Sequence, residues 1–268
     1  MISPAEIARW SHRFGVSDRV IEKDYVLSWL LVAIGKSGLR DALAFKGGTA
    51  LKRAYFPDYR FSEDLDFTIR SDELSHDEVV RGFVDLFPWL ERQVNLGLTL
   101  RSAERSTSGS TTLLINYVGP LRARPGSRYL KVDLTRGELL LYALNEPYLQ
   151  APYSDYPNNV RFPTYSLEEI LTEKLCALIG RTEPRDLYDV YWLLECGQVD
   201  LEALPAGFAA KCRHKGQDPE RLRQVLAARE TTFARLWKSR LAMQVQDLPH
   251  LNEVLRSVHR HLRLLGLA

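Results

Sequence analysis

Features that mark several classes of protein are missing from this 268-residue chain. Its three cysteines, Cys176, Cys196 and Cys212, show no Cys-x-x-Cys spacing and no accompanying histidine pair, so neither a disulfide framework nor a zinc site is indicated. No basic leader with an apolar run opens the sequence, and the apolar stretch at residues 26–34 is too short to span a bilayer. We therefore expect a cytoplasmic protein with no membrane role.

An excess of one charge is also missing, since 36 Lys and Arg face 34 Asp and Glu for a net charge of +2. This balance argues against a strongly basic nucleic-acid coat and against an acidic disordered tail. The charge is unevenly spread, however, because residues 1–200 carry 24 basic and 28 acidic side chains, and residues 201–268 carry 12 and 6. The basic tail is consistent with a polyanionic partner or, alternatively, with an ordinary solvated helix surface.

The first half of the chain alternates between helical and strand patterns. Apolar residues at helical spacing predict helices at 2–14 and 20–34, a helix starting near Ala50, and another at 77–90. Alternating or short apolar runs between turn residues predict strands at 42–45, 64–69, 96–100, 111–118 and 129–134, the last three in an antiparallel arrangement. This half is therefore expected to be an α+β domain.

After Pro163 the sequence becomes helical throughout. Ser166 and Glu169 form a capping-box pattern that opens a helix to about residue 179, and Pro184 stands at the first turn of another. The remainder is rich in Leu, Ala and Arg. We predict a catalytic-type α+β domain over residues 1–160 and a helical domain over residues 161–268.

A pair of aspartates on a predicted strand is the first sign of chemistry. Asp64 and Asp66 are two residues apart, so their side chains share one face of the strand while Leu65 and Phe67 face the core. Paired carboxylates suit Mg²⁺ or Mn²⁺ bridging to triphosphate oxygens. Taken alone, a short motif of this kind is more often a solvent-facing acidic edge strand.

A glycine pair just before that strand favours the functional interpretation. Lys46, Gly47, Gly48 and Thr49 stand between a short apolar run and a helix. Glycines at such a position let phosphate oxygens approach backbone N–H groups, Thr49 adds a hydroxyl donor, and Lys46 could neutralise a phosphate. A plain tight turn is the alternative for the glycines alone.

A third carboxylate, Asp133, lies on another predicted strand, where it shares a face with Lys131. An adjacent strand could place it beside Asp64 and Asp66, and three carboxylates can hold two metal ions about 3.5–4 Å apart. Asp133 would then lie nearest the acceptor and help to deprotonate it. By itself it is an ordinary strand residue.

The helical half offers a second set of charged residues. Lys174 lies in the helix after Ser166, and Asp186 and Asp189 are neighbours on the next helix. One interpretation has Lys174 directed at the nucleotide phosphates and held by Asp189. The other is salt bridging between the helices by Glu173, Lys174, Arg185 and Asp189, with about equal weight.

Together these motifs resemble the AbiEii/AbiGii toxin family of nucleotidyltransferases. The stretches that carry the resemblance run in the family's order, at residues 22–25 (Glu-Lys-Asp-Tyr), 45–51 (Phe-Lys-Gly-Gly-Thr-Ala-Leu), 60–67 (Arg-Phe-Ser-Glu-Asp-Leu-Asp-Phe), 173–175 (Glu-Lys-Leu) and 185–189 (Arg-Asp-Leu-Tyr-Asp). The family's glycine motif is often Gly-Ser, and this chain has Gly-Gly-Thr instead. No motif of the family is found after residue 195.

The resemblance implies a DNA polymerase beta-like nucleotidyltransferase core and the toxin half of a bacterial toxin–antitoxin or phage-abortive system. It puts Ser62 and Asp64 on the family's first motif, Lys174 on its catalytic lysine and Asp189 on the following aspartate. The implied reaction moves a nucleotide from an NTP, with Mg²⁺ or Mn²⁺, to an acceptor such as the 3′ end of tRNA. A cognate antitoxin encoded nearby is the implied protein partner.

In the mechanism that we expect, a hydroxyl attacks the α-phosphate of the NTP and pyrophosphate leaves. Asp64 and Asp66 bind metal, Lys174 stabilises the developing charge, and Arg60 and Ser62 flank the phosphates. The basic tail would receive the acceptor through Arg221, Arg223, Arg229, Arg235, Lys238 and Arg240. Three alternatives remain open: a phosphotransferase on the same core, a nucleotidyltransferase that modifies a protein or small molecule, and a non-catalytic nucleotide-binding module.

Overall fold

The computed structural model describes residues 1–71, 73–107 and 109–267. Its contacts divide the chain into a first unit, Met1–Glu138 with Leu144–Thr164, and a second unit, Leu139–Ala143 with Tyr165–Ala268. The chain passes into the second unit after Thr164, and five earlier residues already belong to that unit. The domain division at residue 161 stays a prediction.

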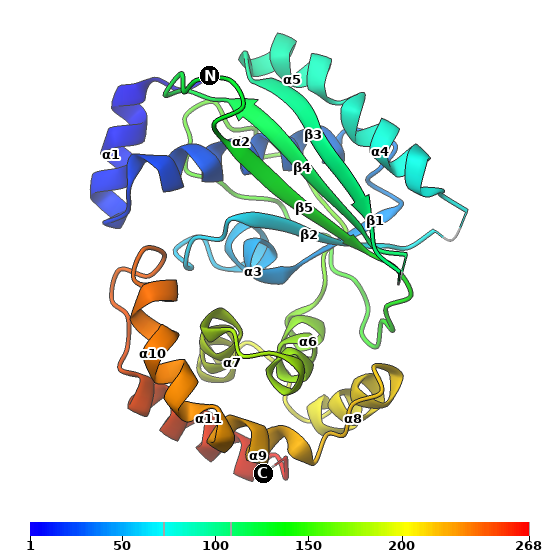
Figure 1. Cartoon of the computed structure of the whole chain (residues 1–268), viewed down its shortest axis with the longest axis vertical. Helices are drawn as coiled ribbons and strands as arrows, with labels where there is room; N and C mark the ends of the chain where they lie inside the picture. The colour runs from blue at the N-terminus through cyan, green and yellow to red at the C-terminus, as the bar shows by residue number, and fades with distance from the viewer. Residues whose placement is uncertain (72, 108, 268) are drawn as a thin grey trace. The chain divides into compact units, whose positions relative to one another are not determined.

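The first unit is built on one mixed sheet of five strands in the order β1-β2-β5-β4-β3 (Figure 1). Neighbouring strands pair antiparallel except β2 and β5, which run parallel. Alternating side chains of β4 and β5 are buried, which is the pattern of strands with one face on the core. The strands are β1 (Leu43–Lys46), β2 (Asp64–Ile69), β3 (Gly97–Arg105), β4 (Thr111–Val118) and β5 (Tyr129–Thr135).

Helices of the first unit pack against this sheet and against one another. The long helix α2 is buried along most of its length, which explains its nearly continuous apolar sequence. A short α-helix directly after β1 packs on β1 and β2 and continues as a π-helix. The helices are α1 (Pro4–Phe14), α2 (Asp18–Gly35), α3 (Gly47–Ala50), the π-helix η1 (Leu51–Tyr55), α4 (His76–Val84) and α5 (Phe87–Val94).

The single helix expected at residues 77–90 is wrong, because the structure has two helices there. The helix α4 ends at Val84 and α5 begins at Phe87, with Pro88 in its first turn. Proline has no backbone N–H and its ring clashes with the preceding turn, so one uninterrupted helix is disfavoured. The two helices α4 and α5 both pack against β3.

The second unit consists of helices, with α6 and α7 at its centre. The helix α6 packs against α7, α8 and α9, and α7 packs against α10 and α11 (Figure 1). The helices are α6 (Leu167–Gly180), α7 (Pro184–Glu195), α8 (Leu204–His214), α9 (Arg221–Ala228), α10 (Glu230–Leu241) and α11 (Leu251–Leu264). In the portion of the chain that is described, no helix is long and apolar enough to cross a membrane.

The predicted capping box at the start of α6 is half correct. The Ser166 hydroxyl accepts a hydrogen bond from the Glu169 N–H at 3.2 Å. The Glu169 carboxylate, however, accepts hydrogen bonds from the N–H groups of Leu141 and Tyr142 at 2.8 and 2.9 Å. A tertiary partner therefore replaces the local one. The predicted fold class, an α+β core with a mixed sheet followed by helices, is confirmed.

Candidate active site

Two neighbouring parallel strands place four charged residues together. In the register of β2 and β5, Asp64 is the Cα partner of Lys131, and Asp66 is the partner of Asp133. Residues two apart on a strand share a face, so the pair on each strand lies on one side of the sheet. The strand pairing therefore brings together the three aspartates that the sequence singled out, with a lysine among them.

Lys131 is the immediate counter-ion of Asp133. Its Nζ lies 2.5 Å from Asp133 Oδ2, and Thr112 on β4 donates a hydrogen bond to Asp133 Oδ1 at 2.7 Å. Burial disfavours the charged ammonium, but the hydrogen bond and charge of Asp133, followed by the charges of Asp64 and Asp66, raise the pKa of Lys131. All three carboxylates thus favour the charged form of Lys131. The role of Thr112 was not foreseen, because only the strand register reveals it.

The glycine pair lies against the acidic strand and the loop before it. Gly47 has a φ of 79°, and a Cβ atom there would lie 2.4 Å from Asp66 Oδ2. A Cβ atom at Gly48 would lie 2.8 Å from Arg60 Nη2 and 3.3 Å from Ser62 Oγ. Any larger residue at these two positions would displace those side chains. The structure therefore brings three predicted site residues, Arg60, Ser62 and Asp66, against the two glycines that begin α3, here called the glycine turn.

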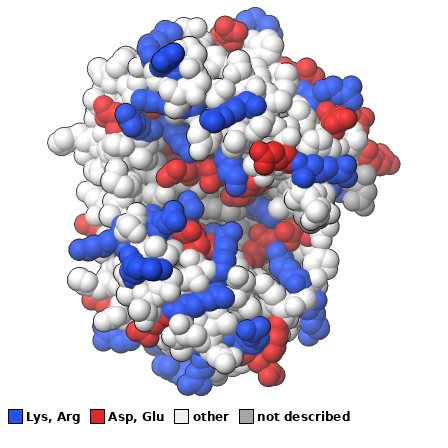
Figure 2. Space-filling view, in the orientation of Figure 1, with Lys and Arg blue, Asp and Glu red and all other residues white. Residues whose placement is uncertain are grey.

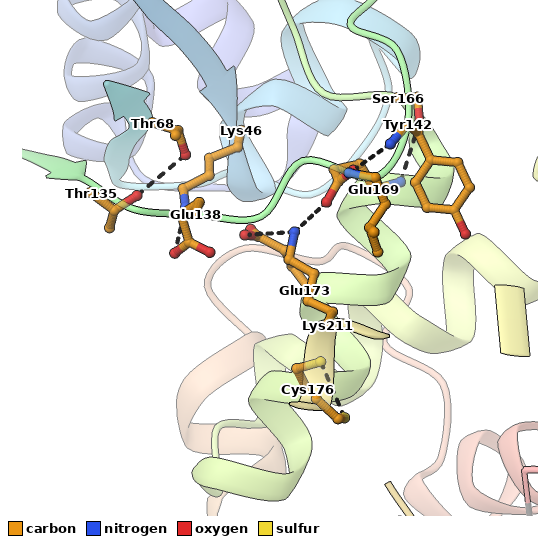
Figure 3. Close-up of polar contacts among 12 residues, drawn as sticks. Lys46, Thr68, Thr135, Glu138, Tyr142, Ser166, Glu169, Glu173, Cys176 and Lys211 are labelled. Carbon is orange, nitrogen blue, oxygen red and sulfur yellow. Dashed lines mark hydrogen bonds and ion pairs between the residues drawn. The ribbon is translucent and has the colours of Figure 1, made fainter. Parts of the chain in front are cut away.

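Two other predicted phosphate ligands have partners within the protein. The Lys46 ammonium is largely buried and lies 3.5 Å from Glu138 Oε1, as Figure 3 shows. The Thr49 hydroxyl donates a hydrogen bond of 2.5 Å to the backbone carbonyl of Asp64. Thr49 therefore holds β2 against α3 with the hydroxyl that the sequence suggested for phosphate. Glu138 escaped prediction because it follows β5 without any local signal.

The donor set of this site suits a hard divalent cation. Asp64 and Asp66 offer carboxylate oxygens, which Mg²⁺ prefers and which need only be one or two in number when substrate phosphates complete the coordination. Throughout the described residues, however, no three His, Cys, Asp or Glu side chains are arranged as a ready metal site. Asp133 is occupied by its contacts with Lys131 and Thr112. Metal binding by these residues stays a prediction.

Lys174 lies at the centre of an ion cluster between α6 and α7. Its Nζ is 2.7 Å from both Asp186 Oδ1 and Asp189 Oδ2, and both carboxylates are buried. Arg181 Nε adds a hydrogen bond of 2.7 Å to Asp186. Burial opposes ionisation of Asp186, yet Lys174 and then Arg181 outweigh it and lower the pKa of this carboxyl.

The predicted pairing of Lys174 with Asp189 is therefore present, as is the helix–helix salt bridging offered as its alternative. Arg185 does not contribute in the way expected, since its Nε is paired with Glu183 Oε1 at 3.4 Å. The action of Lys174 and Asp189 on a nucleotide stays a prediction.

A second buried charge cluster in the helical unit was missed by sequence reasoning. Lys211 and Glu169 are both fully buried and ion-paired, and Glu173 Oε1 lies 3.4 Å from Lys211 Nζ (Figure 3). Through its other oxygen, Glu169 binds the backbone of Leu141 and Tyr142. The cluster thus fastens the segment Leu139–Ala143 to α6. A lone lysine in α8 offers no local pattern that predicts this.

The basic residues of the tail divide into different roles. Arg223 on α9 and Arg256, Arg260 and Arg263 on α11 are exposed and line a groove of about 750 Å³. Arg229, by contrast, donates a hydrogen bond of 3.0 Å to the Leu178 carbonyl and so has a structural partner. On the face shown in Figure 2, Lys and Arg side chains lie over the C-terminal helices with a smaller number of Asp and Glu.

His259 lines the same groove. Burial and then the charges of Arg263 and Arg223 lower the pKa of this histidine, so that the groove adds no further cation near neutral pH. The positive charge of the groove is therefore carried by its arginines.

Solved structures share this fold. MenT4, a nucleotidyltransferase toxin from Mycobacterium tuberculosis H37Rv, superposes with a TM-score of 0.76 at 20% identity, covering 99% of this chain and 90% of that one. JHP933 from Helicobacter pylori superposes with a TM-score of 0.59 at 17% identity, covering 93% of each chain. Comparison with curated protein sequences finds no match.

The fold is thus that of nucleotidyltransferase toxins. The family model described as "Nucleotidyl transferase AbiEii toxin, Type IV TA system" matches residues 29–259. The chain therefore belongs to the AbiEii family, and it is a nucleotidyltransferase of type IV toxin–antitoxin systems. The resemblance inferred from the motifs is confirmed over most of the chain.

Proposed function

We infer that this protein transfers a nucleoside monophosphate from an NTP to an acceptor hydroxyl with the aid of a divalent metal ion, Mg²⁺ or Mn²⁺. The acceptor that we propose is the 3′ end of an RNA, specifically tRNA. Such a transfer would block aminoacylation and stop growth, which suits a toxin that acts in abortive infection and is held in check by an antitoxin encoded nearby.

The observation that carries this proposal is the contact between the acidic strand and the glycine turn. Asp66 pairs with Asp133 across parallel strands and lies so close to Gly47 that a Cβ atom at this position would displace its carboxylate. Carboxylates beside a backbone turn can hold a metal-bound triphosphate without an intervening side chain. A purely structural acidic edge strand has no need of such a close approach.

Each residue of the site has a role in this reaction. Asp64 and Asp66 would hold the metal ion, which when bound would neutralise phosphate charge and lower the pKa of the acceptor hydroxyl. Asp133 takes the proton of the acceptor hydroxyl. The hydroxyl oxygen then attacks the α-phosphate, and pyrophosphate leaves. Arg60, held over Gly48, stabilises the charge that develops on the phosphates.

The remaining predicted residues act around this centre. Gly47 and Gly48 leave backbone N–H groups open to phosphate, Ser62 flanks them, and Lys46 with Thr49 holds the turn against its neighbours. Lys174, oriented by Asp189, is the proposed further cation for the phosphates.

Arginines of the helical unit supply the proposed contact with RNA. Arg223 and the α11 stripe of Arg256, Arg260 and Arg263 form a groove whose positive charge suits a phosphodiester backbone. Among the described residues, no carboxylate lies within ion-pair distance of Arg223, Arg256 or Arg263, whereas Arg260 is paired with Glu195 at 2.7 Å. These three guanidinium groups can therefore bind phosphates without first breaking a salt bridge, although Arg256 Nε donates a hydrogen bond of 3.2 Å to the Asn252 carbonyl.

One labelling experiment tests the proposal. Purified protein is incubated with Mg²⁺, total RNA and each NTP in turn, labelled at the α-phosphate or at the γ-phosphate. We expect α-label in a tRNA-sized band, γ-label only in pyrophosphate, and neither with Asp64→Asn. Transfer of γ-label would instead indicate a phosphotransferase, and a ribonuclease-resistant product would indicate a protein or small-molecule acceptor.

The binding-module alternative needs a separate measurement. Growth inhibition by the wild-type protein is compared with that by folded Asp64→Ala. Toxicity that persists in this variant would show that the acidic cluster is not catalytic.

A further inference from the structure

Lys52 is a buried lysine whose ammonium bonds directly to backbone carbonyls. It lies on the π-helix η1, and only 2% of the residue is exposed. Burial lowers the pKa of Lys52 to about 8, although the charges of Asp24 and Asp58 oppose this shift. A buried ammonium is costly, so groups in direct contact with it must compensate for the lost water.

The compensating groups belong to the loop that follows η1. Lys52 Nζ donates hydrogen bonds to the backbone carbonyls of Pro57 at 3.2 Å and Tyr59 at 2.6 Å. It also lies 4.1 Å from the ring centroid of Phe61 and 5.3 Å from that of Phe14. Two carbonyl dipoles and two aromatic faces therefore lie close to one cation, which is a favourable environment for a buried ammonium.

The Lys52 ammonium is a side-chain clasp on this loop, since it binds two of the loop's backbone carbonyls. Backbone hydrogen bonds from Phe56 N–H to the Leu51 carbonyl and from Tyr59 N–H to the Phe56 carbonyl close its first half. Lys52 bonds to the carbonyl of Tyr59, the residue just before Arg60. Lys52 therefore contributes to the path that the chain takes into Arg60 and Ser62.

That path determines where two residues of the proposed nucleotide site lie. Arg60 is 5% exposed, and its Nη2 and the Ser62 Oγ both lie against Gly48. Both residues come within five positions of the loop carbonyls that Lys52 binds, and β2 with its aspartates begins two residues after Ser62. A shift of the loop would therefore move Arg60 and Ser62 away from the glycine turn.

We propose that Lys52 is a positioning residue of the nucleotide site, whose ammonium holds the loop at residues 56–61 so that Arg60 and Ser62 remain over Gly48. The inference deepens the proposed function and rests on it, since it assigns to Arg60 and Ser62 a part in binding the triphosphate. Lys52 itself touches neither nucleotide nor metal in this scheme.

A cavity beside Lys52 makes the inference directly testable. It has a volume of about 520 Å³, opens to solvent, and is lined by Lys52 together with Trp10, Phe14 and Phe61. A small alkylammonium ion can therefore enter from solution when the lysine side chain is truncated. The carbonyls of Pro57 and Tyr59 would bind it as they bind Lys52.

The experiment uses the full-length protein with Lys52→Ala and measures the dissociation constant of a fluorescent ATP analogue together with kcat for nucleotide transfer. Loss of the clasp is expected to weaken nucleotide binding about tenfold or more, because positioned cations contribute much of the affinity for phosphates. Added n-propylammonium should restore binding in a saturable manner, whereas n-propanol, which is similar in size and uncharged, should not.

Two further variants make the outcome decisive. Lys36→Ala removes an exposed lysine that also lies over an aromatic ring, 5.8 Å from the Trp89 centroid, and it should neither lose affinity nor respond to the amine. Lys52→Met keeps the apolar stem and removes only the charged end. It replaces Lys52→Ala if that variant does not fold, and it should bind nucleotide as weakly.

The inference and the proposed function fail in different ways. Folded Lys52 variants that bind nucleotide within about twofold of wild type, or amine rescue that is equal for Lys36→Ala, would overturn the positioning role alone. A wild-type protein that neither binds nor transfers nucleotides under any condition would overturn the proposed function first.

Discussion

Asp66 on β2 and Asp133 on β5 are Cα partners in a parallel strand pair, although 67 residues separate them in sequence. Neither residue is distinctive by itself, because single aspartates are common at strand edges. Their pairing, with Gly47 against Asp66 and Lys131 on Asp133, gathers three carboxylates near the Lys131 ammonium.

Substitution of Asp66 by Asn tests the proposed metal ligand. The exchange keeps the side-chain shape and removes its negative charge, so that nucleotide transfer is expected to fall by about a hundredfold or more while the fold persists. Asp41→Asn is the matched control, because Asp41 belongs to the same unit and its side chain is 83% exposed. Transfer assays and circular dichroism on both variants give the answer. Equal activity in the two variants would contradict the assignment.

Gly47→Ala separates backbone strain from crowding at the site. Its φ of 79° costs an alanine roughly 1 kcal/mol in the left-handed region, and the new Cβ would also push Asp66 aside. Gly126→Ala is the control, with a similar φ of 76° and nothing within 4 Å of a Cβ atom. Denaturant unfolding should show a comparable loss of unfolding free energy, caused by backbone strain, in both variants. Transfer assays should show loss of activity for Gly47→Ala alone. Full activity of Gly47→Ala would argue against a close approach between Gly47 and Asp66.

Lys131→Met should strengthen binding of a divalent cation. Lys131 places a positive charge among Asp64, Asp66 and Asp133, and its removal leaves three carboxylates without that neighbour. A gain of about tenfold in Mn²⁺ affinity is expected for a partly exposed charge at this range, measured by electron paramagnetic resonance of free Mn²⁺. Lys36→Met serves as the control for general loss of a positive charge. Unchanged Mn²⁺ affinity in Lys131→Met would mean that the ion does not bind at these carboxylates.

Because the pKa of Asp186 is lowered in the folded state, we expect the free energy of unfolding to depend on pH. Its folded-state pKa is below the ordinary value of 3.8, since Lys174 and Arg181 outweigh the effect of burial. The ionised carboxylate therefore stabilises the fold fully above that ordinary value, and the contribution is lost as pH falls through the lower folded-state pKa.

Asp186→Asn should accordingly cost about 3 kcal/mol at neutral pH, the usual scale for breaking a buried ion pair. The difference between wild type and variant should shrink as the solution is acidified toward about pH 3. Denaturant unfolding at a series of pH values measures this difference directly. A gap that stays constant on acidification would show that Asp186 is not the titrating group.

The arginine groove yields a prediction about RNA binding. Reversal of two charges, Arg256→Glu with Arg263→Glu, should weaken binding of tRNA about tenfold or more and reduce the slope of log affinity against log salt by about two. Arg213→Glu with Lys215→Glu, on and just after α8, is the control with equal charge change. Fluorescence anisotropy across salt concentrations distinguishes them. An identical loss of tRNA affinity in both double variants would show that overall charge, and not the groove, determines RNA binding.

Much of the fold and part of the site were predictable because local sequence patterns determine them. The alternation around Asp64 and Asp66 predicted β2 with its observed bounds. Gly47 and Gly48 marked the end of β1, but the helix after it begins at Gly47 and not near Ala50. The break between α4 and α5 was missed although Pro88 indicates it, because the apolar period continues across the proline.

Partners distant in sequence were beyond such patterns. Thr112 on Asp133, Glu138 on Lys46 and Lys52 on the loop carbonyls all depend on side-chain contacts that no local spacing encodes. Buried charges are especially hard to foresee, since a lysine such as Lys211 looks like a solvated residue until its partner is known.

The order of residues by itself determined which side chains face together along one strand or one helix, because periods of 2 and 3.6 residues follow from backbone geometry alone. It thereby specified the aspartate pair, the glycine turn and the helical tail. Only the tertiary structure decided that β5 pairs parallel with β2 in the register that places Asp133 beside Asp66. Strand register depends on burying one face of the whole sheet, which is a property of all five strands together.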